Sequence, residues 1–353
     1  MTFYNRITSD KYADFTLPTT TGFSSIKNNN GVLRNRGLEL ELNAKILRKK
    51  DLRWDLSANI TYNRNRVISL PDNDLLNNRQ GGQEIYTGNG SETVWVGGYQ
   101  EGQEPGQMVG YVFKGLYQKT EDVPYDYIDK NGNGSGKTIV SYAKWETLSE
   151  DDKVYKYIPL RAGDAIWEDI NNDGVIDYKD QKVIGNTTPH WFGGFNTTFT
   201  WKGLTFYGRF DYALGFWNYD RSTPWFNGCG QGTYNATTAV LDSWSEDNTS
   251  GKWPRYVFFD YGAANNYCRP STLFACRGDY LAVRELQLAY SLPKKWIEKI
   301  RCQKIEFSVS GQNLGYLTAY PGNTPETYAG TSFASGDGYG LPRTVLFGID
   351  ITF

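Results

Sequence analysis

The sequence predicts an all-β protein, more specifically a segment of a transmembrane antiparallel β-barrel with about eight strands and long extracellular loops. Apolar and polar residues alternate with a period of two in several stretches, as side chains do on the two faces of a strand. A strand of about 9–11 residues suffices to cross a bilayer. The connections between these stretches alternate between short turns and long loops, an asymmetry typical of outer-membrane barrels. Aromatic residues make up 16% of the chain, although only 39% is hydrophobic.

The predicted strands follow one another along the whole chain. In the first strong one, Leu38, Leu40 and Leu42 alternate with Glu39 and Glu41. The full set of expected strands comprises a weak one near residues 2–9 and stronger ones at 38–46, 54–62, 195–201, 204–212, 281–290, 305–313 and 344–353. The last strand carries its apolar residues at every second position and ends on an aromatic residue: Val345, Phe347, Ile349, Ile351 and Phe353. Such an ending suits the closing strand of a barrel whose aromatic residues face lipid.

The connections favour a barrel over a soluble sandwich. Short turns are expected at 47–53 and 201–203, a modest one with a helical turn after Pro293 at 291–304, and long loops at 66–189, 214–279 and 314–343. Charged residues on the polar faces, such as Glu39, Arg209 and Asp211, suit a water-filled lumen and would be costly in a dry core. The alternative is a soluble surface β-sandwich module that binds glycans with calcium.

The composition and the first residues restrict the function further. Lys and Arg total 37 against 39 Asp and Glu, so a nucleic-acid partner is not indicated. The opening "MTFYNRITSDKYADF" lacks the basic and apolar regions of a signal peptide. We therefore expect residues 1–353 to be the C-terminal part of a longer barrel protein, without its signal peptide.

The strongest local motif is "DINNDGVIDYKD", residues 169–180, which matches the spacing of an EF-hand-type calcium loop with Gly174 at its sixth position. The expected ligands are the side chains of Asp169, Asn171, Asp173, Asp177 and Asp180 and the backbone carbonyl of Val175. Asp180 stands where an EF-hand carries a longer glutamate, and no flanking helices are expected. The alternative is a hydrogen-bonded turn rich in Asp and Asn that binds no metal. Calcium is the only cofactor that the sequence suggests.

No catalytic site is predicted. "DKNGNGSGKT", residues 129–138, imitates a phosphate-binding loop, but Asn131 stands where the motif requires glycine, so a loop tip is the better interpretation. His190 has no Cys or His nearby and no nucleophile motif. We therefore predict that the protein is not an enzyme.

The four cysteines lack the CxxC spacing of a zinc site. A disulfide between Cys229 and Cys268 is compatible with an oxidising cell surface. Cys229 and Cys268 both fall in long loops, whereas Cys302 falls on the short-turn side, and the sequence leaves the pairing open.

A long loop at 215–234 concentrates aromatic residues. Exposed rings of this kind stack on sugars or contact a partner protein, or else they pack together to hold the loop. The sequence leaves both interpretations open. The candidate contact residues are Phe216, Trp217, Tyr219, Trp225, Phe226 and Tyr234.

Several stretches together resemble the SusC/RagA family of TonB-dependent outer-membrane transporters. The fullest is "GDYLAVRELQLAYSLPKKWIEKIRCQKIEFSVSGQNLGYLTAYPGNTPET" at 278–327, with a strand ending in "GQNL" and an aromatic loop with "PE". Two others are "NNGVLRNRGLELELNAKI" at 29–46 and "GDAIWEDINNDGVIDYKDQKVIGNTTPHWFGGF" at 163–195. "SWSEDNTSGKWPRY" at 243–256 is a fainter match. In this order they span nearly the whole chain.

The resemblance implies a bacterial outer-membrane location and import of oligosaccharides or peptides. It implies a barrel of 22 strands, of which this chain would supply about eight, with a plug inside the lumen. It further implies a SusD-like lipoprotein over the outer mouth, and the TonB complex acting through the plug. The plug and the TonB-contacting segment of the family do not match any part of residues 1–353.

Overall fold

The computed structural model describes most of the chain. The described residues are 1–16, 19–23, 25–129, 138–147, 149, 156–158, 160–229, 235–257, 260, 264–298, 301–322, 324–326 and 340–353. The phosphate-loop mimic at 130–137 and Tyr234 lie outside them, as does the side chain of Cys229.

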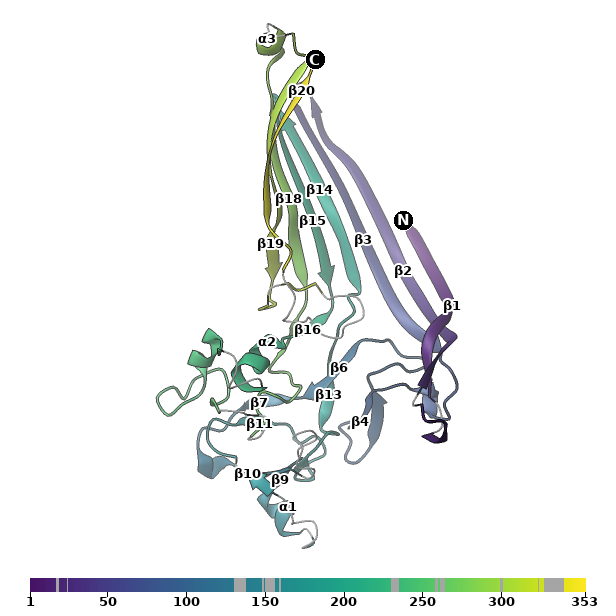
Figure 1. Cartoon of the computed structure of the whole chain (residues 1–353), viewed down its shortest axis with the longest axis vertical. Coiled ribbons are helices and arrows are strands. Elements are labelled where there is room, and N and C mark those ends of the chain that lie inside the picture. The colour runs from purple at the N-terminus through teal and green to yellow at the C-terminus, as the bar shows by residue number, and fades with distance from the viewer. Residues whose placement is uncertain are drawn as a thin grey trace.

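One antiparallel sheet of eight strands dominates the molecule (Figure 1). Its strands are β1 (Thr2–Thr16), β2 (Ser25–Lys49), β3 (Leu52–Ser69), β14 (Trp191–Trp201), β15 (Leu204–Leu214), β18 (Tyr280–Ser291), β19 (Lys304–Thr318) and β20 (Thr344–Thr352). They lie side by side in the order of the sequence, which is the arrangement of an up-and-down barrel wall. All eight predicted strands are confirmed. The first is much longer than the weak strand expected at 2–9.

The two ends of the sheet differ as the sequence predicted. In Figure 1 the C-terminus and α3 (Lys294–Ile297) lie at one end of the sheet, and the long connections gather at the other. The β14–β15 turn consists of Lys202 and Gly203, whose φ angles are 47° and 86°. Two consecutive positive φ angles define the tight hairpin turn that matches strand twist. A Cβ at Gly203 would also lie 2.8 Å from the Ser291 carbonyl oxygen, so glycine is required there.

The register sorts the side chains of the sheet onto two faces. Leu40 pairs with Ile60, and Phe195 lies opposite both Ala58 and Phe210, so apolar residues meet on one face, here called the outer face. The rings of Phe195 and Phe210 stack there with their centroids 4.7 Å apart. The opposite, inner face carries polar pairs such as Asn196 with Arg209. The outer face is exposed, with Phe347 at 84%. It is therefore not one layer of a sandwich among the described residues.

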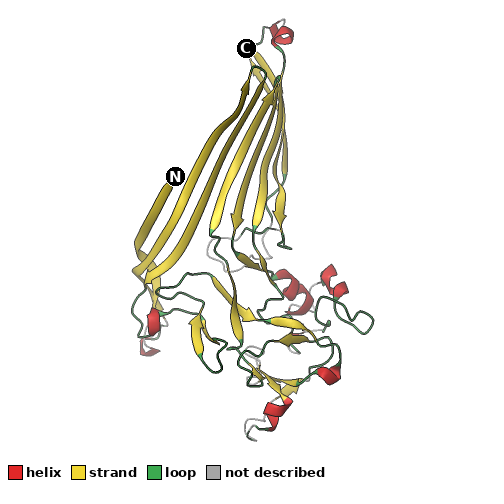
Figure 2. Ribbon diagram, turned by 180° about the vertical axis from the view of Figure 1, so that it is seen from behind, coloured by secondary structure: helices red, strands yellow, loops and turns green. Residues whose placement is uncertain are grey.

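The long connections contain regular structure that the sequence did not predict (Figure 2). The strands of the first are β4 (Gln83–Tyr86), β5 (Thr93–Val96), β6 (Gln107–Tyr111), β7 (Phe113–Leu116), β8 (Tyr125–Asp129), β9 (Thr138–Ser141), β10 (Lys156–Ile158), β11 (Ala165–Trp167), β12 (Val175–Ile176) and β13 (Gln181–Asn186). The second contains β16 (Trp217–Tyr219) and β17 (Ala275–Arg277). Together they form one four-stranded sheet and several two-stranded ones.

The helices are all short. They are η1 (Thr19–Thr21), η2 (Leu76–Asn78), η3 (Thr120–Asp122), α1 (Tyr142–Glu146), α2 (Ser222–Pro224), the π-helical turn η4 (Trp225–Cys229), η5 (Thr238–Asp242) and α3. Within the described residues, no helix has the length and apolarity needed to cross a membrane.

Among the described residues, the buried hydrophobic clusters lie in the connections. The larger one includes Tyr111, Ile139, Trp167 and Ile176, and the smaller one includes Tyr267. Because both long connections contribute to these clusters, we refer to residues 70–190 and 215–279 together as the loop platform.

Candidate functional site

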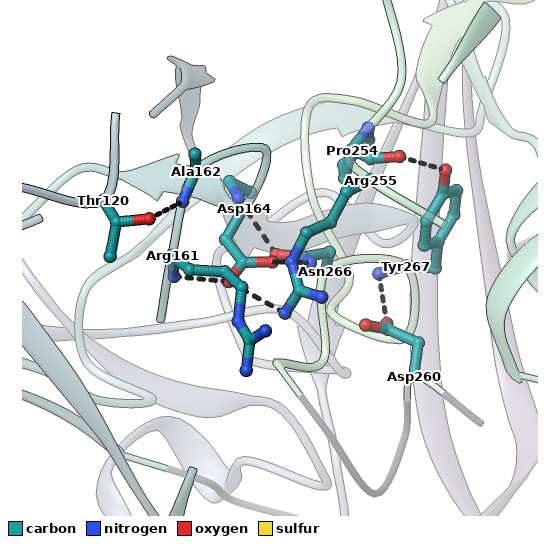
Figure 3. Close-up of polar contacts among 10 residues, drawn as sticks. Thr120, Arg161, Ala162, Asp164, Pro254, Arg255, Asp260, Asn266 and Tyr267 are labelled. Carbon is teal, nitrogen blue, oxygen red and sulfur yellow. Dashed lines mark hydrogen bonds and ion pairs between the residues drawn. The ribbon is translucent and has the colours of Figure 1, made fainter. Parts of the chain in front are cut away.

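A buried ion pair joins the two halves of the loop platform (Figure 3). The Arg255 guanidinium donates from Nε to Asp164 Oδ1 at 2.6 Å and from a terminal nitrogen to Oδ2 at 3.2 Å. The Asp164 side chain is fully buried, whereas that of Arg255 is 18% exposed. Such a bidentate pair is directional as well as strong. It fixes the first long connection to the second.

The remaining acceptor capacity of Asp164 is also used. The backbone N–H of Arg161 donates to Oδ2 at 2.8 Å, and the Asn266 side-chain amide donates to Oδ1 at 2.8 Å. Asn266 in turn accepts a bond from the backbone N–H of Ala165 at 3.0 Å. A buried charge is tolerated when it is paired and hydrogen-bonded in this way. The cluster is therefore a structural clamp.

Asp260 is a second buried acid beside this clamp, and its environment differs. Its Oδ2 accepts the backbone N–H of Tyr267 at 2.7 Å, while its buried Oδ1 has no hydrogen-bond partner among the described residues. Burial raises the pKa of Asp260 to about 6, and the negative charge of Asp164 adds to that effect. The Tyr267 hydroxyl donates to the Pro254 carbonyl at 2.8 Å and so connects Asp260 to the segment that carries Arg255.

The predicted calcium loop is a tight turn closed by its own side chains. Asp169 accepts the Gly174 N–H at 2.9 Å, and Asp173 accepts the Val175 N–H at 2.7 Å. Asn171 accepts the Asp173 N–H at 3.2 Å. Val175 and Ile176 form β12, which pairs with β9, so the loop is part of a sheet and lacks flanking helices, as expected.

Asp180 closes the same loop from the inside. It is fully buried and accepts the N–H groups of Ile170 at 2.9 Å and Asp177 at 2.8 Å. Burial raises its pKa to about 6, with smaller contributions from the charges of Asp177 and Asp169. The predicted acidic residues therefore do gather around one turn. Within the described residues, no group of three or more His, Cys, Asp and Glu side chains is arranged as a metal centre.

The aromatic candidates are divided between the interior and the surface. Phe216 and Tyr219 are 1% and 7% exposed, and Tyr219 packs against Phe274 of the smaller buried cluster. Trp217 is half-buried, with the Arg277 guanidinium 5.2 Å from its ring centroid. Trp225 is 50% exposed. The structure thus gives Phe216 and Tyr219 a packing position and leaves Trp225 accessible.

The histidine and cysteines take structural positions. His190 Nε2 lies 2.6 Å from Glu104 Oε1 at the start of β14. Cys268 is in a disulfide, whereas Cys276 keeps a free thiol whose pKa burial raises to about 12. Since the side chain of Cys229 is outside the described residues, the expected pairing stays a prediction.

On the inner face of the sheet, a bulge brings Arg284 to a polar cluster. Arg284 is the extra residue of this bulge, because its neighbours Val283 and Glu285 have register partners on both β15 and β19 and Arg284 has none. On β19 the shift falls within the "GQNL" segment. Its guanidinium contacts Asp211 of β15, at 2.8 Å to Oδ2, and Glu326 of the "PE" motif. Glu326 also accepts the Tyr316 hydroxyl at 2.7 Å. A cavity of about 520 Å³ lies beside this cluster on the inner face, also lined by Arg209.

Sequence reasoning did not single out these clusters, although a signal was present. Asp164, Arg255, Arg284 and Glu326 all lie within the stretches on which the family resemblance rests. Asp164 and Arg255 occur in separate stretches, and Arg284 and Glu326 lie far apart within one stretch, so the partners of each pair meet only in the fold.

The chain is similar to several curated receptors from bacteria. TonB-dependent receptors P3 and P39 of Formosa agariphila are 28% and 29% identical to it, each over 92% of this chain and over 28% and 30% of their own length. TonB-dependent receptor SusC of Bacteroides thetaiotaomicron is 32% identical over 37% of this chain and 13% of its own. The chain therefore spans less than a third of these receptors. No protein-family model matches it.

The fold is found in solved structures. A chain from a structure of the RagAB peptide transporter superposes with a TM-score of 0.62 at 23% identity, covering 99% of this chain and 33% of that chain. A chain of the RagAB peptide importer in its closed-closed state gives a TM-score of 0.61 at 22% identity, with 99% and 33% coverage. At this level of identity the likeness concerns the fold.

The chain is thus similar in sequence to TonB-dependent receptors, and its fold is that of part of a chain in the RagAB structures. These relatives and structures support the resemblance to the SusC/RagA family that the motifs of the chain predicted. The relatives are receptors and transporters, not enzymes.

Proposed function

We propose that the chain forms part of the wall of a TonB-dependent transporter in the bacterial outer membrane, and that this transporter imports oligosaccharides or peptides. The remainder of the barrel and its plug would complete the pore, with the TonB complex acting through the plug. A SusD-like lipoprotein would cover the outer mouth. Residues 1–353 would have no catalytic role and no nucleic-acid partner.

One observation carries the proposal: a single antiparallel sheet with an exposed apolar outer face and a charged inner face, in a chain related to TonB-dependent receptors over 92% of its length. Such a sheet is stable with lipid against one face and water or protein against the other. The soluble sandwich module would instead have to bury that apolar face.

Uptake by whole cells tests the proposal. Cells that carry the complete gene should accumulate a labelled oligosaccharide or peptide from a mixed panel, and deletion of the gene should abolish this. A protonophore should abolish uptake as well, because TonB draws on the proton gradient. Equal uptake by deletion cells across the panel would contradict the proposal.

We also propose that the loop platform lies outside the cell and that the β2–β3, β14–β15 and β18–β19 turns lie in the periplasm. Support comes from the length asymmetry of the connections, because outer-membrane barrels have short periplasmic turns and long extracellular loops. Trp54, Trp201 and Phe353 would then form the aromatic girdle at the periplasmic end of the barrel. The aromatic loop, with Trp225 exposed, would face the lipoprotein or the solute.

We further propose that the loop 169–180 binds calcium and that this stiffens the loop platform. The donor set suits the ion, because calcium prefers six to eight hard oxygens from carboxylates, amides and carbonyls. The gathering of Asp169, Asp177 and Asp180 around one turn supports the proposal, since a cation would offset their mutual repulsion.

The test of this proposal is limited proteolysis of the complete transporter in detergent. Millimolar calcium should slow cleavage within 169–180, a chelator should reverse the effect, and magnesium should not replace calcium. Asp173→Ala should remove the protection. Cleavage that calcium and chelator leave unchanged would contradict calcium binding.

A further inference from the structure

Four arginines form two cross-strand pairs on the outer face of the sheet. In the β2–β3 register, Arg34 lies opposite Arg66, and Arg36 lies opposite Arg64. The same register places Leu38 opposite Tyr62 two residues further on, so the arginines share the face of the apolar residues. We call Arg34, Arg36, Arg64 and Arg66 the arginine quartet.

The quartet is poorly neutralised within the chain. Among the described residues, Arg64 forms a long ion pair with Glu104, with a nitrogen–oxygen distance of 3.9 Å. The carboxylate of Glu104 also lies 2.6 Å from the His190 ring. Arg36, Arg64 and Arg66 are exposed. The Nε atom of Arg34 is buried and has no hydrogen-bond partner among the described residues. Like charges directly opposite one another destabilise a sheet, so the arrangement needs an external anion.

The position of the quartet points to the membrane surface. Along β3, the outer face is apolar or aromatic from Trp54 to Tyr62, a span of about 27 Å at the rise of a strand. That matches the apolar band of an outer-membrane barrel, which is about 25 Å tall. Tyr62 packs against Trp191, with ring centroids 4.6 Å apart, as an aromatic girdle would at the end of the band. Arg64 and Arg66 follow immediately, at the depth of lipid headgroups.

We propose that the arginine quartet binds the phosphate groups of lipid headgroups in the outer leaflet around the barrel. The arginine fork matches phosphate geometry through paired N–H bonds, which a lysine cannot form. Four adjacent guanidiniums, arranged as two cross-strand pairs, offer room for two phosphate groups side by side on one surface. A headgroup with two phosphates therefore fits better than one with a single phosphate.

The chemistry of the neighbouring positions supports a lipid over a soluble anion. The outer face of β1 beside the quartet carries Phe3 and Ile7, which are 73% and 60% exposed, and Ile7 pairs with Arg34. A ligand at the quartet would thus meet a charged patch and an apolar surface together. A phosphorylated lipid has both parts, whereas inorganic phosphate has only one.

The experiment uses the complete transporter in a neutral detergent, with bisphosphorylated lipid A as the probe. Bound lipid is counted by native mass spectrometry, and heat-modifiable migration verifies that each variant is a folded barrel. Replacing the quartet by glutamine, as Arg34→Gln, Arg36→Gln, Arg64→Gln and Arg66→Gln, should weaken binding by about tenfold or more. The corresponding variant with four lysines keeps the positive charge, so its affinity for lipid A should lie between those of the unaltered protein and the glutamine variant.

The matched control removes four positive charges from the other end of the same hairpin, in and beside its turn, as Arg48→Gln, Lys49→Gln, Lys50→Gln and Arg53→Gln. It should bind lipid A like the unaltered protein. Where the full quartet variant does not fold, Arg36→Gln with Arg64→Gln provides a milder test. Unchanged binding in a folded quartet variant would overturn the proposal. Equal binding of dephosphorylated lipid A, or displacement by inorganic phosphate at equal concentration, would overturn it too.

Discussion

Two buried aspartates of the loop platform illustrate how local surroundings decide the effect of a charge. Asp164 has an arginine, a backbone N–H and an amide as donors, whereas Asp260 has one unpartnered oxygen. Both are fully buried. The first should therefore stabilise the platform as an anion, and the second should stabilise it more when protonated.

Asp164→Asn should loosen the platform, because it leaves the Arg255 guanidinium without its anion. Removing one partner of a buried pair typically costs about 3–5 kcal/mol. Hydrogen exchange of the Ala165 and Arg255 amides in the complete transporter should report this loss. Glu121→Gln is the control, since its pair with Lys119 is exposed and should contribute less than about 1 kcal/mol. Equal protection in the two variants would contradict the clamp.

The pKa of Asp260 predicts an inverse pH dependence for the platform. Its pKa is raised by burial to about 6 in the fold, above its ordinary value of 3.8. The folded state therefore binds the proton more tightly, and stability falls as the pH rises from about 4 through about 6. The effect is at most about 3 kcal/mol. Exchange protection of the Tyr267 amide should follow this course, and Asp260→Asn should flatten it. A rising profile would contradict the assignment.

At the scale of the elements, the strands of the sheet could be predicted from sequence because each is long and has one face in a distinct solvent. The alternation in β2 and β20 records that environment residue by residue. The residues at which the strands begin and end were less predictable. β1 extends to Thr16 through two register shifts, and these have no simple period-two signature.

The strands in the loop platform could not be predicted in the same way. β6 and β13 each have five or six residues and pair across some seventy positions of sequence. Their register depends on tertiary packing around residues such as Tyr111 and Trp167. Arg284 is similar, because only the bulge in β18 turns it toward Asp211 and Glu326. The turn at 169–180 could be singled out from the sequence because the spacing of its Asp and Asn residues is local.

The two faces of β20 provide a test of the lipid-facing assignment. Ile349→Lys introduces a charge in the apolar band and should destabilise the barrel by about 2–4 kcal/mol. Asp350→Lys, one residue along, points to the polar face, where it lies opposite Glu306 and should be tolerated. Urea denaturation of the complete transporter in detergent or lipid should separate the two. Similar losses in both variants would mean that the faces are assigned wrongly.

At the scale of the whole molecule, the sheet has two edges, β1 and β20. Lipid does not tolerate unpaired strand edges, because their backbone groups have no hydrogen-bond partner there. In a membrane, each edge therefore needs a further strand unless the two edges pair with each other. A need for further strands suits a chain that spans less than a third of its relatives.

Residues 1–353 expressed alone should consequently fail to form a native barrel. In detergent the product should migrate identically before and after heating, because heat-modifiable migration requires a closed barrel. The complete transporter serves as the positive control. A folded, heat-modifiable monomer of residues 1–353 would show that the two edges can pair with each other.

The orientation of the barrel in the membrane is the central claim, because the transport proposal, the proposed lipid site and the extracellular placement of the loop platform all depend on it. The direct measurement is antibody access to epitope tags on intact cells that produce the complete transporter. Tags inserted at 225–235, in the aromatic loop, should be labelled on intact cells. Tags inserted in the 291–304 turn should be labelled only after the outer membrane is permeabilised. The reverse pattern would contradict the account.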